Sequence, residues 1–254
     1  MKNFIVSLVT LACLVSAKSW ALQPFIVGTT SGYAPFVSLN DRGGYEGFDI
    51  DVAKELARKL NRPLKLKDCG NMPGLMLALK QNKVDALIWA ISITETRKKR
   101  FELIHYQGEK IDTVPLIFWG QVPENIHTLS DLATQADKPV CVEAGSYQEG
   151  ILQTCSSLSL KYLEGISDVI LDLKCGKSCA SAVDLSLVAR LQHKYPELNV
   201  LFLPLPPHMQ AEGNGICLNK NHELVRAVNR AVTELKQEGV LLQLEKKWGL
   251  KNDT

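Results

Sequence analysis

The 254-residue sequence has no excess of charge of one sign. It contains 29 lysines and arginines against 27 acidic residues, and Lys2 and Lys18 lie in an N-terminal segment described below. Without that segment, the basic and acidic counts are equal. A neutral chain without a basic stripe argues against nucleic acid as a partner and against a role at a membrane surface.

Common catalytic and metal-binding motifs are also missing. The sequence has no GxSxG or HExxH motif and no Cys/His nucleophile signature, and its five histidines are scattered. Cys175 and Cys179, in CGKSC, are closely spaced, but no second cysteine pair or His-x-x-His spacing completes a zinc site. We therefore expect no metal, no cofactor and no enzymatic activity.

Long hydrophobic runs are absent beyond the N-terminus, which predicts no membrane span there. The first residues combine a positive start at Lys2, an apolar stretch from Phe4 to Val15 and a small-x-small ending at Ala21. This pattern predicts a secretory signal peptide over residues 1–21 and a periplasmic protein. Lipoprotein anchoring at Cys13 is the less favoured alternative, because Thr10 stands where a lipobox has leucine.

Six cysteines follow Cys13, an even number in a chain expected to be exported. Such a count predicts one or more disulfide bonds, although the sequence does not choose among the pairings. Free buried thiols are the alternative. The six are Cys69, Cys141, Cys155, Cys175, Cys179 and Cys217.

Short apolar runs alternate with amphipathic helical segments along nearly the whole chain, as in PFIVGTT followed by GFDIDVAKELARKLN. This alternation is typical of βαβ units and parallel sheets. The pattern restarts after residue 110 and ends in a long helical stretch from His222 to Trp248. Two successive sets predict an α/β protein of two lobes, with ligands at the carboxyl ends of the strands.

One strand end has the features of an anion site. In DALIWAISITETRKKR the apolar run continues to Ile93, and Thr94 then has the position of a helix N-cap with Arg97 as the third helical residue. Free N–H groups at a helix start and a guanidinium together suit one carboxylate. The alternative is a capped helix with solvated cations.

Three further polar positions follow predicted strands. Ser146 and Glu149 in GSYQEG form a capping box, which offers a second helix N-terminus to an anion. Asp184 ends CASAVD, where it would receive an ammonium group or simply cap the next helix. Tyr33, in TSGYAPF, would cover the apolar face of a ligand. Together these groups match a zwitterionic amino acid.

The chain resembles the periplasmic polar amino acid binding proteins of ABC transporters, solute-binding family 3. The resemblance runs from Val27 to Gly249 and is carried by VGTTSGYAPF, YEGFDIDVAKELARKL, VDALIWAISITETRKK, VEAGSYQE and VTELKQEGVLLQLEKKWG. It implies two Rossmann-like lobes joined by hinge strands, the type II periplasmic binding protein fold. We expect lobe 1 to comprise residues 22–113 and 212–254 and lobe 2 residues 114–211, with hinges near 111–115 and 210–215.

The resemblance also implies how the ends of a ligand are held. Arg97 and Ser92 would bind the α-carboxylate, helped by the backbone at Ser146 and Tyr147. Lobe 2 would add its groups only when the hinge closes, and the closed form would be recognised by a membrane permease.

The α-ammonium group would be held by Asp184 and by the backbone near Ala90, and Tyr33 would lie over the ligand side chain. These roles imply a monomer whose partners are an amino acid and the permease of an ABC transporter. Two alternatives stay open. One is a dehydratase of the cyclohexadienyl type on the same fold, and the other is a receptor module that senses the ligand.

Four positions depart from the family pattern and bear on selectivity. Thr30 stands where relatives that bind basic amino acids often have aspartate, and Met72 where many have an aromatic residue. Trp89 replaces a small residue and either narrows the pocket or supplies a stacking surface. Glu143 is an acid where relatives are often neutral or basic. We expect a polar amino acid, with a neutral one such as glutamine ahead of arginine or lysine.

Overall fold

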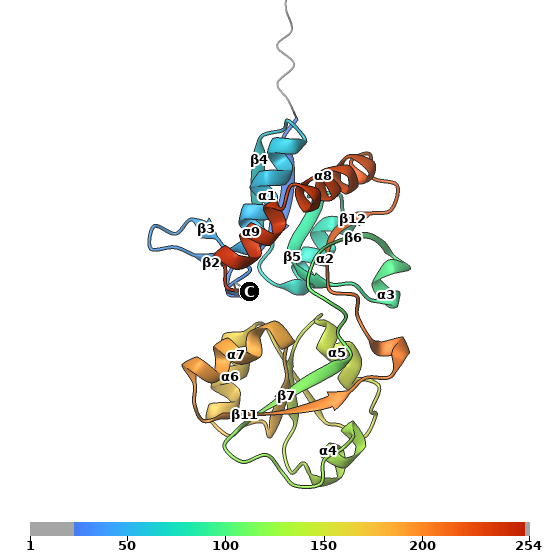
Figure 1. Cartoon of the computed structure of the whole chain (residues 1–254). Helices are drawn as coiled ribbons and strands as arrows, with labels where there is room; N and C mark the ends of the chain where they lie inside the picture. The colour runs from blue at the N-terminus through green and yellow to red at the C-terminus, as the bar shows by residue number, and fades with distance from the viewer. Residues whose placement is uncertain (1–22, 252–254) are drawn as a thin grey trace, which may run out of the picture.

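Two five-stranded sheets form the frame of the molecule in a computed structural model that describes residues 23–251 (Figure 1). The signal peptide expected over residues 1–21 and the possible lipidation site at Cys13 lie outside the described residues. None of the helices within residues 23–251 is long and apolar enough to cross a membrane.

Lobe 1 is built on a sheet with the strand order β4-β1-β5-β12-β6. Strands β1, β4 and β5 run parallel, and β12 lies antiparallel between β5 and β6. The strands are β1 (Phe25–Thr29), β4 (Leu64–Asp68), β5 (Ala86–Ser92), β6 (Phe101–Gln107) and β12 (Asn214–Asn219), beside a short hairpin of β2 (Ser38–Leu39) and β3 (Tyr45–Glu46). The helices are α1 (Phe48–Lys59), α2 (Met72–Lys80), α3 (Glu95–Lys98), α8 (Val225–Gln237) and α9 (Val240–Lys247).

Lobe 2 is built on a second sheet with the order β11-β7-β10-β8-β9. Strands β8, β9 and β10 run parallel, whereas β7 pairs antiparallel with both β10 and β11. The strands are β7 (Thr113–Trp119), β8 (Val140–Glu143), β9 (Leu160–Leu163), β10 (Ala180–Ala182) and β11 (Leu198–Pro204). The helices are α4 (Leu129–Gln135), α5 (Tyr147–Leu152), α6 (Ile166–Lys174), α7 (Leu185–Lys194) and the short 3₁₀ helix η1 (Pro207–Met209).

The chain passes between the sheets twice, from β6 to β7 and from β11 back to β12 (Figure 1). The two crossing segments pair where Ile111 and Ala211 exchange backbone hydrogen bonds of 2.8 and 3.1 Å. The α/β fold of two lobes with two connecting segments, expected from the sequence, is therefore confirmed. Figure 1 also shows α8 and α9 returning to pack beside α1.

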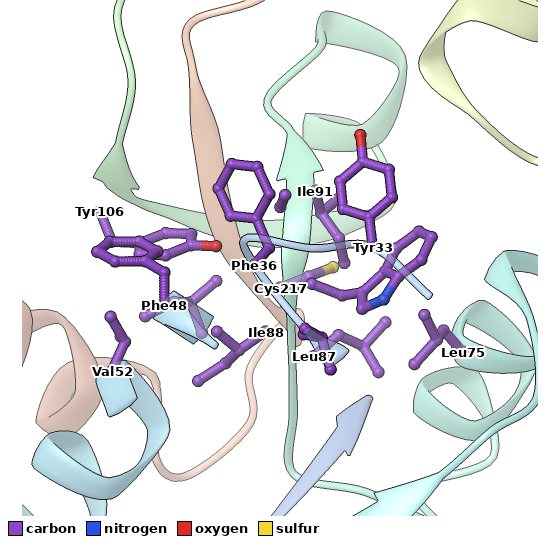
Figure 2. Packing of buried hydrophobic residues seen from close by; sticks show 14 of the residues in the cluster. Tyr33, Phe36, Phe48, Val52, Leu75, Leu87, Ile88, Ile91, Tyr106 and Cys217 are labelled. Atoms are coloured by element: carbon purple, nitrogen blue, oxygen red, sulfur yellow. The ribbon is translucent and has the colours of Figure 1, made fainter. Parts of the chain in front are cut away.

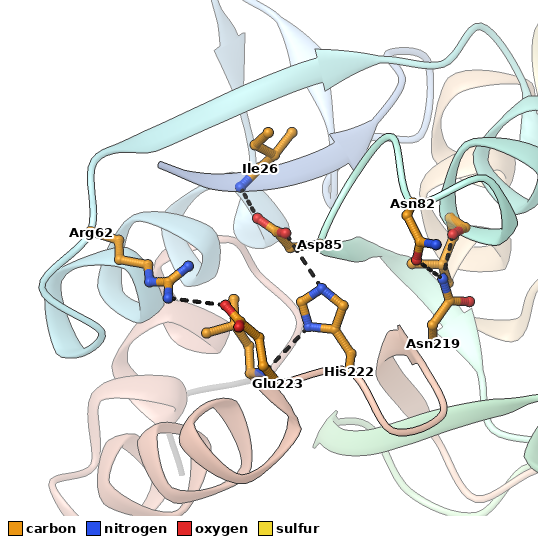
Figure 3. A network of polar contacts seen from close by, with 9 residues as sticks. Ile26, Arg62, Asn82, Asp85, Asn219, His222 and Glu223 are labelled. Atoms are coloured by element: carbon orange, nitrogen blue, oxygen red, sulfur yellow. Dashed lines mark hydrogen bonds and ion pairs between the residues drawn. The ribbon is translucent and has the colours of Figure 1, made fainter. Parts of the chain in front are cut away.

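Polar contacts attach the segment between β12 and α8 to lobe 1 (Figure 3). They lie at the end of the sheet opposite the carboxyl ends of β1 and β5. An Asp85 carboxylate oxygen accepts the backbone N–H of Ile26 at 2.7 Å, and the other lies 3.5 Å from Nε2 of His222. Asn219 Nδ2 donates to Oδ1 of Asn82 at 2.7 Å. These contacts attach the N-terminal ends of β1 and β5 to the end of β12 and the chain that follows it. They do not involve the carboxyl ends of β1 and β5.

Several elements were not expected from the sequence: the short strands β2 and β3, strand β6, helix α4 and the 3₁₀ helix η1. The C-terminal helical stretch is also divided in two. Gly239 has φ 72° between α8 and α9, a left-handed conformation that ends one helix and starts the next. Helix α4 begins at a capping box in which Thr128 and Asp131 cap each other's backbone.

All six cysteines of the described chain carry free thiols, so the disulfide bonds expected from the sequence are not formed in this structure. Cys141 and Cys217 are buried in different sheets. Cys175 is exposed at the end of α6, whereas the thiol of Cys179 donates to the backbone carbonyl of Lys138 at 3.3 Å. The closely spaced cysteines of CGKSC are therefore not joined to each other in this structure.

Gly47 determines where α1 begins, and a testable prediction follows from it. This N-cap residue has φ 132° and ψ 173°, and an added Cβ would lie 2.0 Å from the carbonyl oxygen of Phe36. We expect Gly47→Ala to lower the free energy of unfolding by about 2 to 4 kcal/mol, through backbone strain and overlap.

Urea unfolding of the purified protein measures this loss. The matched control is Gly165→Ala at the N-cap of α6, where φ is −165° and an added Cβ meets nothing within 4 Å. Equal losses in the two variants would contradict the steric explanation.

Candidate functional site

The carboxyl ends of strands from both lobes bring the predicted site residues together. Thr30 follows β1 and Ser92 ends β5 in lobe 1, whereas Glu143 ends β8 and Asp184 follows β10 in lobe 2. All four are buried. In open α/β sheets the carboxyl ends of strands are the usual place for ligands, and here two such edges face each other.

Arg97 joins the two lobes. Thr94 caps α3 by accepting the backbone N–H of Arg97, as expected, although α3 is only four residues long. The Arg97 guanidinium donates through Nη1 to the Ser92 carbonyl at 2.9 Å and through Nη2 to the Gly145 carbonyl of lobe 2 at 3.2 Å. Burial lowers the pKa of Arg97. Its partners are carbonyls, and no described carboxylate forms an ion pair with it.

The loop before α5 packs against lobe 1 at the same point. Gly145 has φ 77°, and a Cβ there would meet Met72 Cγ and Pro73 Cδ at 3.2 Å. Ser146 caps α5 by accepting the N–H of Glu149 at 3.0 Å. The Glu149 carboxylate accepts the N–H of Gly145 at 2.5 Å, one residue before the N–H of Ser146 that a capping box would use.

A cavity of about 320 Å³ lies beside Arg97, Ser146 and Tyr147 and extends to His208. The Tyr147 hydroxyl donates to the backbone carbonyl of Met209 in the segment that returns to lobe 1. The start of α5 is thus attached to one of the two connecting segments.

A smaller cavity, of about 80 Å³, lies between Thr30 and Trp89 of lobe 1 and Glu143 of lobe 2. The indole N–H of Trp89 donates to the Thr30 carbonyl at 2.9 Å. The ring of Trp89 lies 4.7 Å from that of Tyr33, centroid to centroid. Trp89 therefore both narrows this space and gives Tyr33 an aromatic partner.

Two buried acids face Tyr33 from lobe 2. Burial, reinforced by the charge of Asp184, raises the pKa of Glu143 to about 7. Burial also raises the pKa of Tyr33 well above its usual value, with further contributions from the charges of Asp184 and Glu143. Asp184 also caps α7, since Oδ1 accepts from the N–H of Ser186 at 2.8 Å. The Glu143 side chain accepts no hydrogen bond from any described residue.

Asp49 is a residue near the site whose position sequence reasoning missed. It lies in the first turn of α1, two residues after the N-cap Gly47, and is fully buried. One carboxylate oxygen accepts the N–H of Ala90 at 2.8 Å and the other accepts the hydroxyl of Tyr106 at 2.5 Å. An acid between Phe48 and Ile50, both apolar, was the available signal. The backbone N–H of Ala90 therefore already has a hydrogen-bond acceptor within the protein.

Comparison with known proteins gives a consistent result. Residues 25–251 match the family described as bacterial extracellular solute-binding proteins, family 3. The chain is 35% identical over 241 residues to the probable ABC transporter arginine-binding protein ArtJ of Chlamydia trachomatis serovar D, covering 94% of this chain and 91% of that one. It is 27% identical over 234 residues to the arginine-binding extracellular protein ArtP of Bacillus subtilis, covering 89% and 86% of the two chains.

Solved structures with similar folds include an ancestral arginine-binding protein in two complexes. With arginine bound, its TM-score is 0.76 at 27% identity, covering 90% of this chain and 99% of that one. With glutamine bound, its TM-score is 0.74 at 28% identity, covering 89% and 97%.

The raised pKa of Glu143 predicts a pH dependence of stability. A carboxyl group that titrates near 4.5 when unfolded and near 7 when folded contributes stability at low pH, and that contribution is lost as the pH rises through about 7. Glu143→Gln should therefore gain stability relative to the unsubstituted protein between pH 5 and pH 8. The gain should approach about 3 kcal/mol, at roughly 1.4 kcal/mol per pKa unit.

Urea unfolding of the ligand-free protein at both pH values measures this difference. The matched control is Glu164→Gln, because Glu164 is exposed at the rim of the same cavity. If Glu143→Gln and the unsubstituted protein showed the same pH dependence, Glu143 would not titrate abnormally.

Proposed function

The chain belongs to the bacterial extracellular solute-binding proteins, family 3, and we propose that it captures a cationic amino acid, arginine first, between its two lobes. The observation that carries the choice of a cation is the buried acid pair Glu143 and Asp184. No cation of the described residues lowers the pKa of Glu143. The sequence favoured a neutral ligand because Thr30 is uncharged. The acid pair Glu143 and Asp184 provides the negative charge that position 30 lacks, and we therefore favour a cationic ligand.

Each charge of the ligand has a counterpart in the site. The Arg97 guanidinium, which lacks an anionic partner among the described residues, would bind the α-carboxylate, together with Ser92 and the N–H groups at Ser146 and Tyr147. A half-buried guanidinium such as that of Arg97 gains most from a partner that completes a bidentate pair.

The cationic groups would lie on the opposite side of the cleft. Asp184 would accept the α-ammonium, helped by the backbone near Ala90, and Glu143 would accept the charged end of the side chain. Tyr33 and Trp89 would cover the aliphatic part and face the cation, with Met72 on the other side. The arginine-binding names of the relatives support this choice.

Entry of the ligand requires the lobes to separate, because the site residues come from both sheets. The cavity at Glu143 holds about 80 Å³, less than the roughly 300 Å³ typical of a small-molecule pocket. The hinge would lie at the Ile111–Ala211 pairing, with lobe 1 formed by residues 22–113 and 212–254 and lobe 2 by residues 114–211. The ligand then shifts the population toward the closed form.

We propose that the closed form is recognised by the permease of an ABC transporter and that the protein acts as a periplasmic monomer. The family and the named relatives are solute-binding proteins, which favours binding over a dehydratase that would use Glu143 as its acid or base. Sensing of the same ligand would use the same site.

Arg97→Ala should weaken arginine binding most strongly, because it leaves a buried carboxylate without its cation. The expected loss is about 2 to 5 kcal/mol, the usual cost of breaking a buried charged pair. Isothermal titration with L-arginine measures it. Arg100→Ala, three residues along and exposed, is the control and should bind normally. Near-native affinity in Arg97→Ala would show that this guanidinium does not hold the carboxylate.

Glu143→Gln should separate arginine from glutamine. We expect arginine affinity to fall by about 2 kcal/mol or more, since a charged hydrogen bond is lost, while glutamine affinity changes little. In the unsubstituted protein, arginine affinity should rise between pH 5.5 and pH 8, because Glu143 must ionise to receive a cation. Competition titrations with both amino acids test this. An equal loss for both ligands would remove Glu143 from selectivity.

A further inference from the structure

Strand β5 is irregular at the point where it enters the site. Opposite β12, Leu87 pairs with Cys217 and Ile91 pairs with Gly215, so β5 uses two more residues than its partner over this stretch. Ala90 lies within it and has φ 43°. A left-handed conformation is unfavourable for alanine and needs support from its surroundings. Extra residues of this kind re-aim side chains and are common beside binding sites.

Asp49 supplies support at this residue. Its buried carboxylate comes from the first turn of α1 and accepts the N–H of Ala90 through Oδ2, while the Tyr106 hydroxyl from β6 donates to Oδ1. Burial raises the pKa of Asp49 to about 7, and the two hydrogen bonds oppose that shift. The side chain thus links α1, β5 and β6 at one point.

Aromatic rings pack around the contact between Asp49 and Tyr106. Figure 2 shows the rings of Tyr106 and Phe48 stacked beside each other, and their centroids are 5.8 Å apart with planes 13° from parallel. Phe36 packs edge-on to Phe48 at 6.2 Å and stacks on Tyr33 at 5.7 Å. A continuous row of aromatic rings therefore leads from the Asp49 contact to Tyr33.

The irregular stretch determines where Trp89 and Ser92 lie. Trp89, directly before Ala90, turns its indole N–H to the Thr30 carbonyl, and its ring packs against that of Tyr33 with the two planes tilted by 35°. Ser92, two residues after Ala90, presents the carbonyl that accepts from Arg97. If Ala90 adopted ordinary strand geometry, both groups would change position relative to the cleft.

We propose that Asp49 is a positioning residue of the binding site, which holds Ala90 in its left-handed conformation so that Trp89 and Ser92 face the ligand. It acts through Ala90 and touches no ligand itself. The effect on affinity rests on the proposed function, whereas the effect on Trp89 does not.

The test begins without ligand, with the Trp89 indole N–H resonance of the ¹⁵N-labelled protein, assigned by its loss in Trp89→Phe. Asp49→Ala should shift or broaden this resonance. Adding Ala90→Gly should restore it, because glycine adopts positive φ without support. Recovery of folding by Ala90→Gly in an otherwise unfolded Asp49→Ala variant would count equally. A native Trp89 resonance in Asp49→Ala, or a second substitution that restores nothing, would overturn the proposal.

Asp49→Asn distinguishes the hydrogen bond from the charge. Its amide oxygen still accepts the N–H of Ala90, so the Trp89 resonance should stay near its native position. A shift as large as that of Asp49→Ala would overturn the proposal. The matched control is Asp172→Ala, which removes another buried acid with two hydrogen-bond partners, Lys161 and Ser178, in lobe 2. It should lower stability and leave the Trp89 resonance unchanged.

Titration with L-arginine then measures the consequence for binding. Affinity should fall tenfold or more in Asp49→Ala and recover in the double variant, whereas Asp172→Ala should bind normally. Equal affinity in Asp49→Ala and the unsubstituted protein would overturn the positioning role in binding. If the unsubstituted protein bound no arginine, the proposed function would fail, and the Trp89 resonance would still decide the structural role of Asp49.

Discussion

Unpaired charge at the junction of the two lobes is the constraint on which the rest of the structure depends. Within residues 23–251, the Arg97 guanidinium has only backbone carbonyls as partners, and no cation offsets the charges of the buried acids Glu143 and Asp184. Burying charge without a partner is costly. In the function we propose, a molecule that carries both signs would complete this arrangement, and the second acid would select its side chain.

The sheets make this arrangement possible by presenting strand ends to one another. Polar contacts that anchor the returning chain, such as Asp85 with Ile26, lie at the opposite end of lobe 1. Gly145 of lobe 2 packs directly on Met72 of lobe 1, and its carbonyl oxygen accepts a hydrogen bond from Arg97. The absence of a side chain at Gly145 allows this close approach of the two lobes.

Much of this architecture could be predicted from local sequence patterns. The strand ending at Ser92, the cap at Thr94 and the place of Arg97 follow from an apolar run that stops at a hydroxyl. Strand β6 was missed because FELIHYQ mixes charged and apolar residues, and it becomes a strand only by pairing with β12 from the far end of the chain. The contact of Asp49 with Ala90 was missed for a related reason, since its two residues lie 41 positions apart and neither carries a local signal for the other. A hydrophobic period of two or 3.6 residues indicates which face of a strand or helix is buried. It does not indicate which other element packs on that face.

The position of β12 within its sheet has a consequence for how the molecule is made. This strand is contributed by residues 214–219, yet it lies between β5 and β6, which come from the first half of the chain. The sheet of lobe 2 is contiguous in sequence and can assemble as soon as residues 113–204 are available. Lobe 1 must wait with an open gap in its sheet until the last strand arrives, and pairing over so long a sequence separation is slow. The lobe that carries Arg97 is therefore the last to form, and the two lobes cannot bring their strand ends together before the chain has been made as far as β12.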